Sequence, residues 1–208
     1  MFKKDPRIAY WLEENLYLNI TNRCSNNCYF CLRNFSDGVG GFNLKLNKEP
    51  SVAEIISGLQ EIINRKNWNE IVFCGFGEPL KRLNCILEVT RWIRKNFGKN
   101  AIIRVDTNGH GRLLNKNRNV IKELKEAGID KLRVSVNAQN EQIYNKICRP
   151  KITNAFAATL EFSKKAKKSI DVEITAVAVP EANLSEIRKI ARNLGLKFKI
   201  RKYISYSE

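Results

Sequence analysis

The 208-residue chain lacks several features that would define its class at once. It has no apolar stretch long enough to span a membrane, and its N-terminus, Met1 to Pro6, lacks the apolar run of a signal peptide. It also has no internal repeat, low-complexity tract or linker. We therefore expect one domain over residues 1–208, located in the cytoplasm, where thiols are kept reduced.

Disulfides are not expected in such a compartment, although the chain has six cysteines. Three of them, Cys24, Cys28 and Cys31, stand at CxxxCxxC spacing directly after an alternating apolar run at 16–21. This grouping indicates metal binding or catalysis. Three thiolates leave one coordination position open, whereas structural zinc sites and most electron-transfer clusters have four protein ligands.

Zinc is the alternative for the same triad. It would need a fourth ligand from elsewhere, such as Cys148 or the single histidine, His110, which stands between two glycines and is expected in a loop. The second CxxC pair of a zinc ribbon is missing, which argues against this alternative. Cys74, on a predicted strand, and Cys85, on an apolar helix face, are expected to be small core residues.

The net charge of +16 favours an anionic partner, such as a nucleotide-like substrate, an acidic protein or nucleic acid. The basic residues are spread over several segments, mostly on the outward faces of predicted helices. Charge in such positions is usually solvated. Nucleic-acid binding is therefore not the favoured interpretation.

Apolar patterns of strands and helices alternate along the chain. Strands are expected at 16–21, 71–74, 101–105, 131–136, 172–179 and 196–203, and helices near 52–65, 81–97, 117–127, 153–167 and 184–194. Ser51 and Glu54 form a capping box at the first helix. The alternation predicts an α/β fold with an open, curved, six-stranded parallel sheet and outer helices, a partial (β/α)6 TIM-like barrel. Residues 33–50 are expected to be a long loop that covers the site.

Unusual residues follow the predicted strands, at the sheet edge where α/β proteins bind ligands. The first strand is followed by the three cysteines and the second by Gly75-Phe-Gly77-Glu78-Pro79. The third ends in Asp106-Thr-Asn108-Gly109, and the fourth carries Ser135 and Asn137. Each of these turns is weak evidence alone, and their placement at successive strand ends gives them weight.

The cysteine triad together with the Gly75–Pro79 turn resembles the radical S-adenosylmethionine (SAM) enzymes, over essentially the whole chain. Within that superfamily, four stretches look like the TatD-associated radical SAM proteins: 16–24, 73–80, 134–138 and 147–150. The superfamily often has Gly-Gly-Glu in its second motif, and this chain has Phe76 between the glycines. The same variant occurs in the TatD-associated group.

The resemblance implies that Cys24, Cys28 and Cys31 hold three irons of a [4Fe–4S] cluster and that SAM chelates the fourth. An external electron donor would reduce the cluster, and cleavage of SAM would yield a 5′-deoxyadenosyl radical that takes hydrogen from a substrate. The resemblance also implies further positions that contact SAM. Phe30 would lie near the adenine, and the methionine ammonium would be bound by Gly75, Gly77, Glu78 and Pro79. The ribose or carboxylate would be contacted by Asn108, Ser135 and Asn137, with Asp106 as an additional contact.

Three side chains have more than one interpretation. Glu78 either contributes charge to the SAM site or braces its turn. Cys148, expected on a loop, is either structural or a thiol on the substrate side, and Arg149 beside it is a candidate contact for an anion. The sequence identifies no substrate.

Other functions also remain open. A 7-carboxy-7-deazaguanine synthase has a similar size, but that family typically has Asp-Thr after its third cysteine, where this chain has Leu32-Arg33. A glycyl-radical activating enzyme is suggested by the turn at 106–109. A different class is a basic, metal-containing nucleic-acid-binding module, which predicts salt-sensitive binding and no SAM turnover.

Overall fold

The computed structural model describes residues 5–98 and 101–204. A seven-stranded sheet has the order β1-β2-β5-β6-β7-β8-β9. Its strands are β1 (Ala9–Leu12), β2 (Asn15–Leu18), β5 (Glu70–Phe73), β6 (Ile102–Thr107), β7 (Lys131–Ser135), β8 (Asp171–Val177) and β9 (Lys197–Arg201). The strands from β2 to β9 are all parallel, which confirms the predicted six-stranded parallel sheet. Met1–Lys4, at the N-terminus where no signal peptide is expected, lie outside the described residues.

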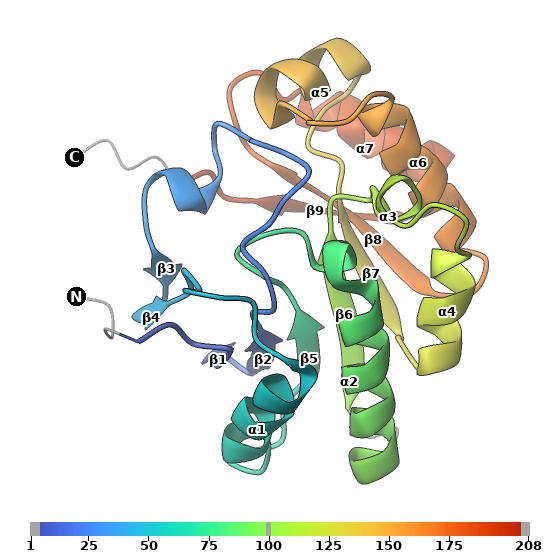
Figure 1. The fold of residues 1–208 in the computed structure, drawn as a ribbon. Helices are drawn as coiled ribbons and strands as arrows, with labels where there is room; N and C mark the ends of the chain where they lie inside the picture. The colour runs from blue at the N-terminus through green and yellow to red at the C-terminus, as the bar shows by residue number, and fades with distance from the viewer. Residues whose placement is uncertain (1–4, 99–100, 205–208) are drawn as a thin grey trace.

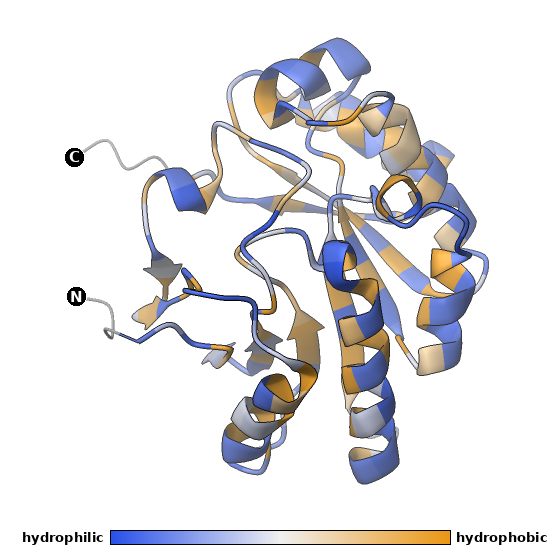
Figure 2. Cartoon of the chain, viewed as in Figure 1, coloured by the Kyte–Doolittle hydropathy of each residue, from blue (hydrophilic) through white to orange (hydrophobic). Residues whose placement is uncertain are grey.

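The helices cover the outer side of the curved sheet (Figure 1). They are α1 (Val52–Ile63), α2 (Leu83–Phe97), α4 (Val120–Ala127), α6 (Ala155–Ala166) and α7 (Leu184–Asn193), with two shorter ones, α3 (Gly111–Leu114) and α5 (Glu141–Cys148). Buried aliphatic residues of β2, β5, β6, β7 and β8 form one core with these helices. Figure 2 shows β5 as a hydrophobic strand and largely hydrophilic outer surfaces on α2 and α4. Within the described ranges, no helix has the length and apolarity needed to cross a membrane.

Strand β1 is an addition to the predicted sheet. It pairs antiparallel with β2 through a two-residue turn, so the first predicted strand is the second arm of a hairpin. Tyr10 and Tyr17 stack across this hairpin with ring centroids 5.2 Å apart. Tyr10 also belongs to a small second cluster with Phe42, Leu44 and Phe76.

The predicted long loop at 33–50 contains short elements of regular structure. The segment contains the end of a 3₁₀ helix, η1 (Leu32–Asn34), and a short hairpin of β3 (Gly38–Val39) and β4 (Phe42–Asn43). It then runs along the segment that follows β2. There the side-chain amide groups of Asn19 and Asn22 donate to the backbone carbonyls of Leu44 and Leu46, respectively, both at 2.7 Å. The second predicted helix, 81–97, is likewise divided into the 3₁₀ helix η2 (Pro79–Arg82) and α2.

Helix α5 also contradicts the sequence interpretation, because it places Cys148 at the end of a helix rather than on a loop. Asn140 caps its N-terminus by accepting from the Ile143 amide at 2.9 Å. Tyr144, Ile147 and Cys148 are fully buried in the main core. The helix therefore packs as part of the barrel wall.

The predicted capping box of α1 is confirmed. The Ser51 hydroxyl accepts from the Glu54 amide at 3.2 Å, and the Glu54 carboxylate accepts from the Ser51 amide at 2.6 Å.

We expect Ser51→Ala to lower the free energy of unfolding by about 1 kcal/mol, measured by urea denaturation, because an unpaired donor remains at the helix start. Ser185→Ala, at an exposed position inside α7, is the control and should change stability little. Equal effects of the two changes would contradict the assignment.

Candidate functional site

The three clustered cysteines lie on one loop that follows β2 (Figure 1). All three are free and half-buried. The loop has little regular structure, so its backbone polar groups need partners from elsewhere. Two segments distant in sequence supply them.

The first is the turn after β5. The amides of Gly77 and Glu78 donate to the carbonyls of Thr21 and Arg23, both at 2.8 Å. A Cβ atom on Gly77 would lie 2.2 Å from the Arg23 carbonyl oxygen, and one on Gly75 would lie 2.8 Å from that of Thr21. The two glycines therefore permit close contact between this turn and the start of the cysteine loop.

The second is the segment at the end of α5, residues 147–151. The Tyr29 amide donates to the Ile147 carbonyl at 3.1 Å, and the Asn27 amide donates to the Cys148 carbonyl at 3.0 Å. In return the Lys151 amide donates to the Ser25 carbonyl at 2.8 Å. The cysteine loop is thus hydrogen-bonded on both sides.

A network of buried, hydrogen-bonded side chains also holds the cysteine loop in place. The Asn108 amide group donates to the Ser25 hydroxyl at 2.8 Å, and His110 Nδ1 lies 2.9 Å from that hydroxyl. His110 Nε2 lies 3.0 Å from the Tyr144 hydroxyl, which accepts from the Asn26 amide group at 3.0 Å. His110 lies on the loop between β6 and α3, as expected, but it is fully buried with both ring nitrogens in use and is not available as a zinc ligand.

Glu78 is 2 % exposed, and its carboxylate accepts from the Leu80 amide, the Thr107 hydroxyl and the Asn108 amide at 2.7–2.9 Å. These bonds connect the turn after β5 to the end of β6. Burial raises the pKa of Glu78 to about 6, although the three hydrogen bonds oppose the shift. Of the two interpretations from sequence, bracing of the turn is the one with observed contacts.

One cation, Arg33, lies beside the sulfur atoms of the cysteine loop. Arg33 Nε donates to Cys31 Sγ at 3.3 Å, and Cys31, Cys24 and Cys28 in turn all raise the pKa of Arg33 against the effect of its burial. Arg33 Nη1 also donates to the Asn22 carbonyl at 2.9 Å. No role was predicted for Arg33 from the sequence. Its position two residues after the last cysteine could have indicated a contact with the thiols.

Each ligand candidate has a distinct environment. Burial and the nearby Glu78 raise the pKa of Cys24 to about 11. The neighbouring Cys148 thiol lowers the pKa of Cys28, helped by the charges of Arg33 and Arg201, while the pKa of Cys148 rises. Cys148 therefore lies beside the triad.

The remaining predicted residues lie around this loop. Asn137 is 4 % exposed and donates to the Cys148 sulfur at 3.9 Å, whereas Ser135, at the end of β7, is half-buried. Phe30 packs edge-on against Tyr29, and Arg149 lies over the Tyr29 ring at 5.9 Å. Asp106 forms ion pairs with Arg104 and Arg133 on the sheet face opposite the helices.

The two other cysteines differ from each other. Cys85 lies in the main core, as predicted. Cys74 follows β5 and is half-buried outside that core, with Asp106, Arg201 and Arg133 close enough to affect its pKa, which burial raises. The expectation that Cys74 is a core residue is therefore wrong, because its side chain faces the charged side of the sheet.

The donor set fits a cuboidal iron–sulfur cluster better than a single ion. In the described ranges, no three His, Cys, Asp or Glu side chains converge closely enough to hold one metal ion. A cube in which each thiolate binds a different iron needs wider spacing of the sulfur atoms than one zinc ion does. The three half-buried thiols offer one thiolate to each of three irons, and Arg33, which donates to Cys31 Sγ, would offset part of their charge.

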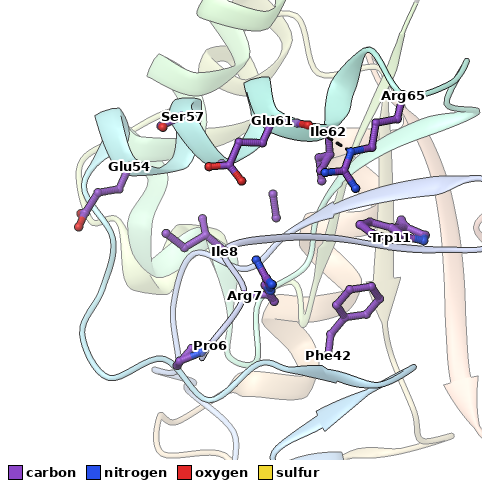
Figure 3. A pocket seen from close by; sticks show the side chains of 12 residues that line it. Pro6, Arg7, Ile8, Trp11, Phe42, Glu54, Ser57, Glu61, Ile62 and Arg65 are labelled. Atoms are coloured by element: carbon purple, nitrogen blue, oxygen red, sulfur yellow. Dashed lines mark hydrogen bonds between the residues drawn. The ribbon is translucent and has the colours of Figure 1, made fainter. Parts of the chain in front are cut away.

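Two hollows lie elsewhere on the molecule. One of about 340 Å³ lies between β1 and α1, where Arg65 covers the Trp11 ring (Figure 3). The other, of about 890 Å³, lies between α3, α4 and α6. None of the predicted site residues lines either hollow. The candidate site is therefore defined by the cysteine loop and the strand ends, not by these hollows.

Comparison with known proteins agrees with this geometry. The family model described as the radical SAM superfamily matches residues 18–194. A probable GTP 3′,8-cyclase of Methanococcus aeolicus is 26 % identical and covers 94 % of this chain and 61 % of its own length. The GTP 3′,8-cyclase of Corynebacterium glutamicum strain R is 28 % identical and covers 86 % and 45 %. The chain thus spans about half to three fifths of these curated relatives.

Solved structures show the same fold at low identity. SuiB of Streptococcus suis bound to S-adenosylmethionine superposes with a TM-score of 0.70 at 13 % identity, over 93 % of this chain and 41 % of that one. Methylornithine synthase (PylB) gives 0.64 at 14 % identity, over 91 % and 53 %. These likenesses confirm the predicted partial-barrel fold. The likeness to the TatD-associated group has no counterpart among these relatives.

The contact between Gly77 and Arg23 gives a first test of the site. Gly77→Ala should lower the free energy of unfolding by about 1–3 kcal/mol, because its Cβ would overlap a backbone oxygen. Gly58→Ala is the control: its Cβ, inside α1, would meet Ala9 at an ordinary 3.7 Å, so helix propensity should make it neutral or stabilising. Chemical denaturation of both variants measures this. A destabilised Gly58→Ala with an unaffected Gly77→Ala would refute the packing.

His110 gives a pH-dependent test. Burial lowers its pKa from 6.5 to about 4, so the unfolded chain binds a proton between these values that the folded chain does not. His110 therefore contributes stability above pH 6.5, and this contribution, up to about 3 kcal/mol, is lost as the pH falls toward 4. In metal-free protein, the stability difference between wild type and His110→Gln should shrink by this amount between pH 7 and pH 4. Identical pH slopes would contradict the assignment.

Proposed function

Because the chain belongs to the radical SAM superfamily, we propose that it is a radical SAM enzyme in which Cys24, Cys28 and Cys31 bind a [4Fe–4S] cluster. The superfamily uses such a cluster with S-adenosylmethionine and requires an electron donor. When bound, the cluster and SAM supply a one-electron cleavage of the sulfonium whose product, a 5′-deoxyadenosyl radical, removes hydrogen from a substrate. The observation that carries the proposal is the presence of three free, half-buried thiols on one loop, with Arg33 bonded to one of them.

The chain's own residues have two tasks in this proposal. One is to hold the cluster: the loop is fixed by the turn at 75–79 and by residues 147–151, and Arg33 offsets the thiolate charge. Cys148 has a supporting role, since its thiol lowers the pKa of Cys28.

The other task is to bind SAM. We assign the methionine ammonium to the backbone of the turn from Gly75 through Gly77 to Pro79, the adenine to the side of Phe30, and the ribose or carboxylate to Ser135. Asn108 is already bonded to Ser25, and its backbone amide to Glu78. Asn137 is likewise bonded to the Val177 amide and the Cys148 sulfur, so we assign Asn108, Glu78 and Asn137 to positioning. Arg149 lies over Tyr29, on the loop side of the site.

The substrate is a separate part of the proposal. Residues 1–208 act as one radical SAM core in it. Relatives at 26–28 % identity are named GTP 3′,8-cyclases, so GTP is the first compound to try. The motifs at 16–24 and 147–150 support placement in the TatD-associated group, for which the substrate chemistry is open.

The direct test is anaerobic reconstitution with iron and sulfide, followed by reduction with dithionite in the presence of SAM. We expect about four irons per chain and release of 5′-deoxyadenosine. Cys28→Ala should lose the cluster and the product, because two thiolates hold a cube poorly. Cys85→Ala, which changes a core cysteine away from the loop, is the matched control and should retain both. Tightly bound zinc without SAM cleavage would overturn the proposal.

A further inference from the structure

The sheet face opposite the helices, here called the inner face, carries charged residues of β9. Phe198 packs toward α7, where Arg188 lies over its ring at 5.4 Å. Side chains alternate along a strand, so Lys197, Lys199 and Arg201 lie on the inner face. All three are exposed.

The acids of the inner face already have partners. Ion pairs within and between strands β5 to β8 join Glu70 to Arg104 and Lys131, Asp106 to Arg104 and Arg133, and Glu173 to Arg133. Among residues 5–98 and 101–204, no ion pair is formed by Lys199 or Arg201. These two cations remain available to a ligand.

A buried hydroxyl beside them also lacks a partner. Thr175 is paired in register with Ser135 on one side and Lys199 on the other, so the three side chains form one row across β7, β8 and β9. Thr175 is fully buried, and its Oγ1 has no hydrogen-bond partner in the described structure. An unsatisfied buried hydroxyl is costly, so an acceptor for its proton is expected.

The row lies next to the cysteine loop. Ser135 ends β7, and Arg201, one step further toward the carboxyl edge, is close enough to Cys28 for its charge to act there. Neighbouring strands are about 4.8 Å apart, so the row spans about 10 Å. Beside Ser135 it presents the Thr175 hydroxyl and the Lys199 ammonium, with the Arg201 guanidinium two residues further along β9. These donors match the acceptor oxygens of a phosphoryl group.

We propose that Thr175, Lys199 and Arg201 bind a phosphoryl group of the substrate, next to Ser135 at the border with the SAM site. This rests on the proposed function, whose SAM site it adjoins, and it assigns the substrate to phosphorylated small molecules. No bond is made or broken at this row. Its task is to orient the substrate by charge-assisted hydrogen bonds.

The test is calorimetric titration of the cluster-loaded enzyme, saturated with SAM, with inorganic tripolyphosphate at constant ionic strength. We expect Lys199→Gln to weaken tripolyphosphate at least tenfold and Thr175→Val to weaken it several-fold without loss of stability, because valine removes an unpartnered hydroxyl. Lys197→Gln is the matched control: it lies on the same strand and face, but beside Glu173, and should change the affinity less than twofold.

Three outcomes would contradict the proposed phosphoryl site. Equal weakening by Lys197→Gln and Lys199→Gln would mean that the strand attracts anions only through its general charge, which overturns the inference. So would loss of SAM affinity in Lys199→Gln, or equally tight binding of tricarballylate, a carboxylate probe. Any of these with normal 5′-deoxyadenosine release leaves the proposed function intact. Absence of SAM cleavage in the wild type overturns that function instead.

Discussion

The candidate site depends on hydrogen bonds between the backbone of the cysteine loop and two segments far from it in sequence. Amides at 77 and 78 bind the start of the loop, and residues 147–151 exchange bonds with its middle. A loop with little secondary structure cannot satisfy its own polar groups. The position of the three thiols is therefore set by the carboxyl edge of the sheet. The same dependence explains why Gly77 has no room for a side chain.

The two faces of the sheet have different physical characters. The helix side holds one continuous apolar core, which supplies the stability that a functional surface cannot. The inner side carries cross-strand ion pairs and the unpartnered Thr175 hydroxyl. Charge and polarity are thus concentrated where a substrate would meet the cysteine loop. The high net positive charge, ambiguous in composition alone, has at least one specific location, at Lys199 and Arg201 on β9.

Local sequence patterns predicted the parallel strands, the long helices and the Ser51 cap, because periodicity and capping depend on neighbours in the chain. Strand β1 was missed because its turn places Glu13 at φ 51°, without the glycine or asparagine that usually marks such a hairpin. Helix α5 was missed although Asn140 and the spacing of Tyr144, Ile147 and Cys148 were available signals. The burial of His110 and the contact of Cys148 with Cys28 could not be predicted, since both arise from partners distant in sequence.

In the proposed enzyme, three thiolates hold a cluster whose fourth iron binds SAM. Electron–nuclear double resonance on the reduced, reconstituted protein, with ¹⁷O in the carboxylate of SAM, detects this binding. We expect a hyperfine coupling between the labelled oxygen and the cluster, lost in Cys28→Ala and retained in Cys85→Ala. A reduced cluster that shows no coupling to the label at saturating SAM would contradict it.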